Sequence, residues 1–258
     1  MNRVFKSLGS MLFLAAALPT AANAADVAMP EASSDWQFTA TAYLWGTSIS
    51  GQTGVFGLPP QDIDISFSDI LENLDFAVMG AAEARKGPFM LGMDLTYSKL
   101  SAEPETPFGI VAKSVDVSVT TWMVTGVAGY AIVDNESVGL DVMAGGRLWS
   151  VQNDFGFNGG LADGVEVDDG ATWVDPLAGA KLRLNLTPEI YASGWAMIGG
   201  FGVGSDLMWD VMGGAGYKFT DHFSVFAGYR AVSVDYSNDG FVFDVVEQGP
   251  VMAAVFHF

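Results

Sequence analysis

Thirteen charged residues lie on the more polar face of segments that alternate in polarity, and they are the chain's main candidates for chemistry. The seven acids are Glu83, Asp94, Asp116, Asp141, Asp175, Asp210 and Glu247; the six bases are Arg85, Arg147, Lys181, Arg183, Lys218 and Arg230. Side chains that share one interior must pair, because a lone charge away from water costs several kcal/mol. We therefore expect an interior charge network that fills the space between the segments. The alternative is a charged lining that conducts cations or protons.

The two histidines, His222 and His257, are the only imidazoles available for acid–base catalysis. Both fall at one end of the expected strands, where neither can reach a substrate held at the other end, and such catalysis requires hydrogen-bond reach. The glycine clusters at 199–204 and 213–216 lack the order of a phosphate-binding loop. We predict no enzyme activity, no cofactor and no built metal centre.

The other acids crowd the segments between the alternating runs. They are Asp62, Asp64, Asp69, Glu72 and Asp75; Asp154, Asp163, Glu166, Asp168 and Asp169; and Asp235 and Asp239. Carboxylate oxygens are ligands for Ca²⁺ and Mg²⁺, so divalent cations are candidate partners. The segment 235–240 has calcium-ligand residue types but lacks the register of a calcium loop. We expect a solvated acidic rim.

Positioning these charges requires strands, and alternation with a period of two recurs from Trp36 to the end. For example, Phe89, Leu91, Met93, Leu95 and Tyr97 alternate with polar or small residues. Half of the residues are hydrophobic, yet no apolar run of 18 residues follows residue 24. Hydrophobicity spread by alternation is typical of a transmembrane β-barrel.

Tight breaks alternate with longer ones, as expected for short turns on one side of a membrane and loops on the other. The pattern predicts an antiparallel up-and-down barrel of ten strands, with eight as the alternative because 189–200 alternates poorly. A short amphipathic helical turn is expected at 67–74. The predicted strands are 36–49, 76–85, 88–100, 114–133, 138–151, 172–185, 189–200, 206–219, 223–236 and 241–258.

Pro176 and Pro250 fall inside predicted strands, where each removes a hydrogen-bond donor. Because a closed barrel has no free edge for proline, we expect a bulge at each. If neither is a bulge, the sixth and tenth strands would be misplaced.

The N-terminal residues indicate export. Residues 1–24 combine Arg3 and Lys6, a short apolar run at 11–18 and the small-residue exit Ala22-Asn23-Ala24, which predicts a cleaved signal peptide. Residues 25–35 are then a periplasmic extension, and 36–258 the barrel. Without Arg3 and Lys6, nine bases oppose 30 acids, a net charge of about −21. This balance excludes nucleic acid, which demands a basic face.

The closing residues predict recognition by the outer-membrane assembly machinery. Met252, Ala254, Phe256 and Phe258 place apolar or small residues at every second position, ending on phenylalanine. Together with the signal peptide, this pattern predicts an assembly signal carried by Met252, Phe256 and Phe258.

The chain resembles a family of bacterial outer-membrane β-barrel proteins of mostly unassigned role. The matching segments are Tyr43–Gly51 (YLWGTSISG), Phe67–Phe76 (FSDILENLDF), Gly199–Asp206 (GGFGVGSD), Ala227–Arg230, Asp235-Tyr236, Gly249-Pro250 and the closing Phe258. The resemblance spans nearly the whole mature chain. It implies the barrel fold and no catalytic residue.

We therefore predict an integral protein of the bacterial outer membrane, in contact with lipid and lipopolysaccharide, with a largely plugged lumen and acidic extracellular loops. Its expected role is structural or interactive at the cell surface. A narrow cation-preferring channel is the second hypothesis and an outer-membrane hydrolase the third. A soluble lipocalin-like barrel is a further rival, whose apolar rows would pack inward.

Overall fold

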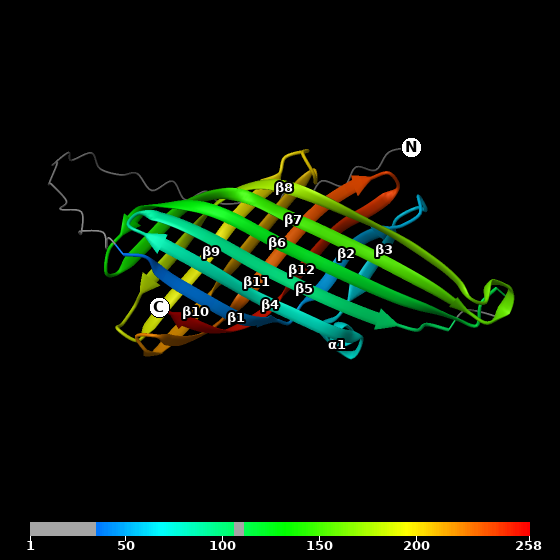
Figure 1. Ribbon diagram of the computed structural model, residues 1–258, viewed down its shortest axis with the longest axis horizontal. Coiled ribbons are helices and arrows are strands. Elements are labelled where there is room, and N and C mark those ends of the chain that lie inside the picture. Colours follow the sequence, from blue (N-terminus) through cyan, green and yellow to red (C-terminus); the bar gives the residue numbers. More distant parts are fainter. Residues whose placement is uncertain (1–34, 106–110) are drawn as a thin grey trace, which may run out of the picture. The chain divides into compact units, whose positions relative to one another are not determined.

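Alternating side chains build one continuous wall in the computed structural model, which describes residues 35–105 and 111–258. Ten antiparallel strands pair in chain order, and β1 closes the barrel by pairing with both β4 and β12 (Figure 1). The ten-strand prediction is confirmed, and eight is wrong. The strands are β1 (Gln37–Trp45), β4 (Leu74–Lys86), β5 (Phe89–Ala102), β6 (Ser114–Asp134), β7 (Val138–Asn158), β8 (Val165–Asn185), β9 (Ile190–Gly200), β10 (Leu207–Thr220), β11 (Phe223–Asn238) and β12 (Phe241–His257). The predicted signal peptide at 1–24 lies outside the described residues, and so does the predicted periplasmic segment as far as residue 34.

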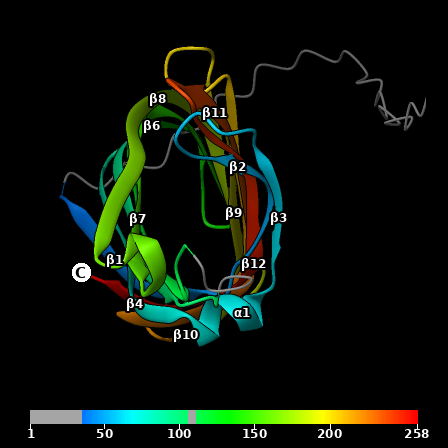
Figure 2. The same cartoon turned by 90° about the vertical axis from the view of Figure 1, so that its right-hand side faces the viewer.

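The first strand continues past a short break as β2 (Ser48–Gly54), which pairs with the other half of β12. β2 then turns back into β3 (Gln61–Ile65). The predicted helical turn is α1 (Phe67–Glu72), whose N-terminus has a capping box: Ser66 Oγ accepts from the Asp69 backbone N, and Asp69 accepts from the Ser66 backbone N. A 3₁₀ turn, η2 (Gly160–Ala162), lies in the connection between β7 and β8. Seen end-on, the strands form a ring (Figure 2).

Neither proline lies in a bulge, so that prediction is wrong. Pro250 keeps an unbroken register with β11, and the pairing of β1 and β2 with β12 is in the same register on both sides of it. The Pro250 carbonyl accepts from the Gly46 N at 2.9 Å, so only the bond that proline cannot donate is lost. Pro176 pairs with Gly146 on β7, and the β8–β9 ladder begins one residue later, at Leu177. The sixth and tenth strands therefore include the segments predicted for them, although the sixth begins earlier, at Val165.

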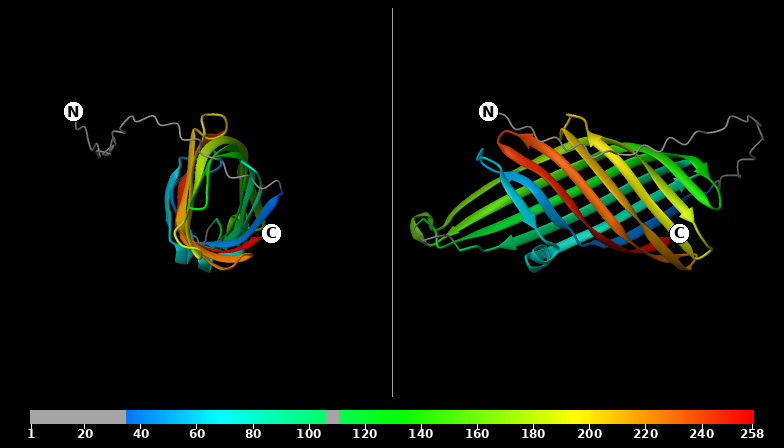
Figure 3. Two further views of the ribbon diagram at one scale, coloured as in Figure 1. Left: turned by 90° about the vertical axis from the view of Figure 1, so that its left-hand side faces the viewer. Right: turned by 180° about the vertical axis from the view of Figure 1, so that it is seen from behind.

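Three neighbouring strands are long, and two of them, β7 and β8, are each seven residues longer than predicted. β6, β7 and β8 have 21 residues each, and the predicted loop at 152–171 consists largely of paired strand. These strands project beyond the rest of the wall, as Figures 1 and 3 show. We call the part formed by residues 114–118 and 153–169 the extension.

The outer face of the wall is apolar and exposed, as a membrane-spanning barrel requires. Outward side chains include Leu91, Val142, Val174, Val211 and Met252, each at least 45% exposed. The rival arrangement, in which these rows pack against one another inside a soluble barrel, is wrong. Within the described residues, no helix is long and apolar enough to span a bilayer.

The two ends of the barrel differ. The ends of β1 and β12 meet, with Thr39 opposite His257, beside the turn at 221–222 and on the side of the other tight turns. Exposed rings contact one another there, such as Phe89 with Tyr130 and Phe223 with Phe256. Aromatic girdles flank both faces of a membrane barrel, so it is the short turns that identify the periplasmic end. Outward carboxylates, including Asp154 and Asp168 directly opposite each other, lie toward the other, extracellular end.

Placing a cation on the outer face tests this arrangement. We expect Val211→Arg to lower the free energy of unfolding by about 2–4 kcal/mol, because the guanidinium would sit in hydrocarbon. Urea unfolding in lipid vesicles measures the change. Val165→Arg, on the extension, is the matched control and should change stability by less than about 0.5 kcal/mol. Equal effects at both positions would contradict the placement of Val211 in the membrane and Val165 outside it.

Candidate functional site

A group of buried and nearly buried charges crosses the middle of the lumen. Asp210 on β10 accepts through one carboxylate oxygen from Arg147 at 2.5 Å and from Arg230 at 2.7 Å. Arg230 also donates to Asp94 and to the Tyr43 hydroxyl, each at 3.1 Å, and Tyr43 donates to Asp94 at 2.8 Å. The side chains of Arg147, Asp210 and Arg230 are at most 1% exposed. We call Asp94, Arg147, Asp210 and Arg230 the central ion group; its two guanidinium groups and two carboxylates balance.

A second group lies on the periplasmic side of the first. Arg85 binds both oxygens of Asp141, at 2.9 and 2.7 Å, and approaches Glu83 at 3.3 Å. Lys181 forms an ion pair with the other oxygen of Glu83. We call Glu83, Arg85, Asp141 and Lys181 the periplasmic ion group, and it is also balanced. Strands β4, β7 and β8 bring these residues together although up to 98 positions separate them in the sequence.

The other predicted members of the charge network have different surroundings. Asp175 is fully buried and accepts from the Ser205 backbone N at 2.7 Å, so it anchors the β9–β10 loop rather than balancing a cation. Arg183 approaches Asp134 at 3.6 Å, and both side chains are half exposed. Lys218 contacts Asn185 Oδ1 at 3.4 Å.

Two more of the predicted charges need correction or qualification. Asp116 is exposed and accepts from Asn158 at 2.9 Å. Odd-numbered residues of β6, such as Met123 and Thr125, face inward, so Asp116 lies on the outward face of the extension and its placement in the lumen is wrong. Glu247 belongs to the inward row of β12 and is partly buried, and it makes no ion pair with any residue in the described ranges.

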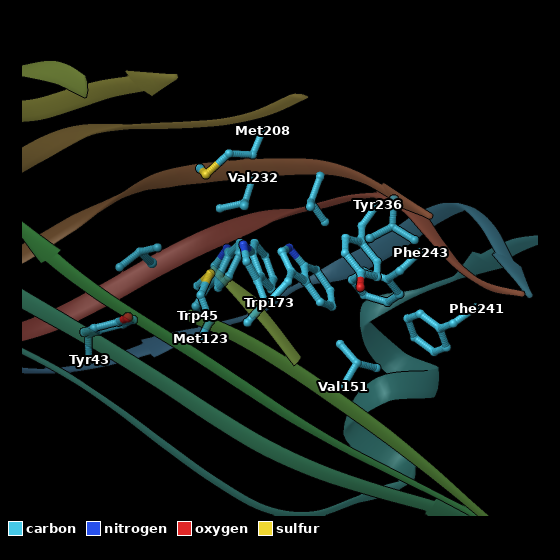
Figure 4. Close-up of a cluster of buried hydrophobic side chains, with 14 residues drawn as sticks. Tyr43, Trp45, Met123, Val151, Trp173, Met208, Val232, Tyr236, Phe241 and Phe243 are labelled. Atoms are coloured by element: carbon cyan, nitrogen blue, oxygen red, sulfur yellow. The ribbon is translucent and has the colours of Figure 1, made fainter. Parts of the chain in front are cut away.

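A cluster of aromatic side chains fills the extracellular half of the lumen (Figure 4). Trp173 stacks on Tyr236 across the barrel with ring centroids 3.9 Å apart, and Trp149 lies parallel to Trp173 at 5.9 Å. We call Trp45, Trp149, Trp173, Tyr236, Phe241 and Phe243 the aromatic plug; all six are buried.

The plug and the central ion group are in direct contact. The Arg147 guanidinium lies 5.7 Å from the Trp149 ring, and that of Arg230 lies 5.0 Å from Trp45. These cation–π contacts join the charged layer to the apolar one.

The sequence pattern contains the plug, although we did not predict it. Trp149 lies two positions after Arg147, and Trp173 lies two positions before Asp175, so each shares the inward face of its strand. A polar face that also carries large rings was the signal for a filled interior.

The extracellular mouth is crossed by the β2–β3 turn. The Phe56 ring contacts Phe155 with centroids 5.7 Å apart, and the Phe56 backbone N donates to Asp169 on β8 at 2.5 Å. The Gly57 backbone N donates to Gly240 O in the β11–β12 turn at 3.1 Å. The turn therefore connects opposite walls above the plug.

The periplasmic half of the lumen is hollow. A cavity of about 640 Å³ extends from Asp94 and Arg230 at its inner end to Arg183, Asp221 and His222 beside the periplasmic turns. Charged side chains and apolar ones such as Trp195 and Phe226 both line it. The interior thus has three levels: aromatic plug, central ion group and cavity.

The two histidines lie at the periplasmic end. His257 contacts the Thr39 hydroxyl at 3.2 Å and the Ser224 hydroxyl at 3.5 Å, and Ser224 contacts the Tyr191 hydroxyl at 3.1 Å. His222 Nδ1 is 3.1 Å from the His257 carbonyl oxygen. The contacts of both rings are thus with hydroxyl groups and a backbone carbonyl.

Many of the clustered carboxylates serve local backbone or side-chain contacts. Asp62 accepts from Gln52 at 2.8 Å, Asp75 from Ser101 at 2.6 Å, and Asp163 from the Gly159 backbone N at 2.7 Å. In the parts of the chain that the structure describes, no three acids or histidines are grouped as a metal site would need. Binding of divalent cations at these loops stays a prediction.

The residues of the predicted assembly signal share the outer face of β12. Met252, Phe256 and Phe258 are 68%, 41% and 74% exposed. Their recognition by the assembly machinery stays a prediction.

No protein-family model matches the sequence, and no curated protein does. Among solved structures, the outer-membrane protease OmpT from Escherichia coli is similar with a TM-score of 0.56 at 10% identity, over 90% of this chain and 99% of that one. The translocator domain of the autotransporter NalP from Neisseria meningitidis matches 86% of this chain and 88% of its own at 15% identity, with a TM-score of 0.47. Ail of Yersinia pestis matches 86% of this chain and 98% of its own at 13% identity, with a TM-score of 0.35.

The chain has the fold of a bacterial outer-membrane β-barrel protein. The closed wall and its apolar exterior place it in the outer membrane, in contact with lipid, as the sequence predicts.

Removing one carboxylate tests the central ion group. We expect Asp210→Asn to lower the free energy of unfolding by about 3–5 kcal/mol, because it leaves two buried guanidinium groups with too little opposite charge. Urea unfolding in lipid vesicles measures this change. Asp116→Asn, which removes an exposed carboxylate from the extension, should change stability by less than about 0.5 kcal/mol. A loss below about 1 kcal/mol for Asp210→Asn would contradict this account.

Proposed function

We propose that this protein is a non-conducting outer-membrane barrel that acts at the cell surface through the extension. The observation that carries the proposal is the closed interior. An ion crossing the lumen would meet the aromatic plug and then the central ion group, in which the side chains of Arg147, Asp210 and Arg230 are at most 1% exposed. Barrels of this size are nearly filled by side chains, and the two layers fill the extracellular and central parts of this one.

The energetics of the two layers oppose conduction. A hydrated cation at the central ion group would meet guanidinium groups whose charges are already balanced by carboxylates. At the plug it would lose water to rings that offer no ligand oxygen, and an uncompensated ion in an apolar site is strongly disfavoured. Both layers would have to rearrange for an ion to pass.

The extension supplies the surface function in this proposal. It carries Asp116, Asp154, Glu166, Asp168 and Asp169 beyond the apolar belt, and Asp154 and Asp168 face each other across two strands. Like charges opposite one another destabilise a sheet, so this arrangement favours a role that compensates for the cost. Contact with cationic groups, or with divalent ions that bridge lipopolysaccharide phosphates, would provide that compensation.

A cation-preferring channel is the second candidate, because charged side chains line the periplasmic cavity. The cavity ends at the central ion group, however, and this geometry supports a pocket better than a path.

We also propose that the protein is not an enzyme. The similarity to a protease favours a hydrolase by analogy, but both histidines lie at the periplasmic end, and their contacts are with hydroxyl groups and a backbone carbonyl. Peptide and lipid A hydrolysis assays with purified protein test this proposal, and activity lost on His257→Ala would overturn it.

Planar-bilayer recording tests the closed lumen. We expect no stable single-channel steps from the purified protein, because the aromatic plug and the central ion group block the path in series. A porin recorded in the same bilayer controls for detection, and heat-modifiable gel mobility controls for folding. Stable cation-selective steps would contradict the proposal and favour the channel.

Epitope insertion tests the display of the extension. An epitope placed between Gly160 and Gly164 should be labelled by antibody on intact cells, because this turn ends the extension. The same epitope inserted after Leu186, in a tight turn at the other end, should be labelled only after permeabilisation. The opposite pattern would show that the orientation is inverted.

A further inference from the structure

We propose that the cavity in the periplasmic half of the barrel is a binding site for a small amphipathic molecule that carries one anionic carboxylate. The inference concerns the end of the barrel opposite the extension and does not depend on the surface role. It rests on the distribution of basic residues, on one cation that lacks a carboxylate partner, and on an apolar wall beside that cation.

Basic residues are concentrated at this cavity. The chain has nine lysines and arginines after residue 34, and five of them line the cavity: Arg85, Lys181, Arg183, Lys218 and Arg230. The acids have the opposite distribution, because 28 follow residue 34 and only Glu83, Asp94 and Asp221 line the cavity. In a strongly acidic protein this local excess of cations needs an explanation.

Carboxylates already balance the charge of three of these five basic residues. Arg230 belongs to the central ion group, and Arg85 and Lys181 belong to the periplasmic ion group, both of which are neutral. Arg183 has a distant contact with Asp134, at 3.6 Å between half-exposed side chains.

Lys218 is different from the other four. Its contacts are the Asn185 side-chain oxygen at 3.4 Å and the Tyr191 ring at 5.7 Å, both uncharged. Lys218 makes no ion pair with any residue at 35–105 or 111–258. One ammonium without a carboxylate therefore faces the cavity, with the Arg183 guanidinium as a second, weakly engaged donor near the mouth.

The wall beside Lys218 is apolar and aromatic. Tyr191, Phe226 and Val255 form one buried cluster, with Met212 against it. Met197 belongs to a second buried cluster, with Met90, Met143 and Leu177, and Trp195 packs against that cluster. A site that pairs apolar side chains with a few placed polar groups is the usual form of a small-molecule pocket.

The shape and charge of the cavity define the ligand class. The inner end is closed by Arg230 and Asp94, so a ligand enters and leaves through the periplasmic mouth. A volume of about 640 Å³ suits a small organic molecule rather than a folded partner. One carboxylate would reach Lys218 and Arg183, while an aromatic or aliphatic body would cover Trp195, Phe226 and Met212.

The test uses the full protein in nanodiscs of zwitterionic lipid, with 2-naphthoate as the probe. Isothermal titration calorimetry, corrected with empty nanodiscs, should show saturable binding at one site per barrel. The neutral analogue 2-naphthylmethanol should bind about tenfold more weakly or worse, because it lacks the charge that Lys218 recognises. The cationic analogue 2-naphthylmethylammonium should show no saturable binding.

Variants test whether Lys218 supplies the positive charge that binds the carboxylate. Lys218→Gln should weaken 2-naphthoate binding about tenfold and leave 2-naphthylmethanol binding unchanged, whereas Lys99→Gln, which removes an exposed lysine far from the cavity, should change neither. Met212→Trp should reduce binding of both probes by filling the apolar wall. Heat-modifiable gel mobility confirms that each variant is folded.

Several outcomes would overturn the proposal. One is the absence of saturable binding above empty nanodiscs, and another is equal affinity for the carboxylate and the alcohol. A third is unchanged affinity in folded Lys218→Gln. The preference for the carboxylate over the alcohol is measured on the unaltered protein, so the proposal can be rejected even if a variant does not fold.

Discussion

Two guanidinium groups share one buried carboxylate at the centre of this barrel, and the organisation of the interior depends on that contact. Asp210 accepts from Arg147 and Arg230, which come from strands on either side of it in the sequence. Neither arginine could occupy a site with so little access to water without that charge. Trp149 and Trp45 pack against the two guanidinium groups, so the same residues that satisfy Asp210 also support the plug. Strands β7, β10 and β11 are thereby held at a fixed distance across the lumen.

Charge is separated along the barrel axis. Carboxylates such as Asp116, Asp154 and Asp168 lie on the extension, while the periplasmic cavity gathers five of the nine bases that follow residue 34. The central ion group and the aromatic plug divide these two regions, so the barrel presents an acidic face outside the cell and a cationic pocket toward the periplasm. In the proposed non-conducting barrel, a solute in one region would have no open path to the other, and the two ends would serve separate roles.

Particular residues show how far sequence reasoning extends. The inward positions of Glu83, Arg85, Asp141, Asp210 and Arg230 followed from alternation alone, because successive side chains of a strand point to opposite faces. Their partners did not follow, since pairing across the lumen depends on strand register and tilt. Asp116 was misplaced for a different reason: Met123 and Thr125 show that odd-numbered residues of β6 face inward, so Asp116 lies on the outward face. In this segment the more polar row is the outer one. The predicted bulges at the two prolines were wrong because each strand tolerates the missing hydrogen-bond donor. The β8–β9 ladder begins only after Pro176, and Pro250 loses a single bond while its carbonyl still accepts from Gly46.

The sequence by itself determined the fold class, the number of strands, the membrane-facing rows and the end at which short turns lie. Each of these features depends only on the local period of two and on the residues of the turns. Only the tertiary structure decided which charges pair, that tryptophans close the lumen, that three strands extend beyond the membrane, and that Lys218 is left facing a cavity. Those features depend on where strands distant in the sequence meet across the barrel. A period of two fixes the face on which a side chain lies, but not the side chain it meets.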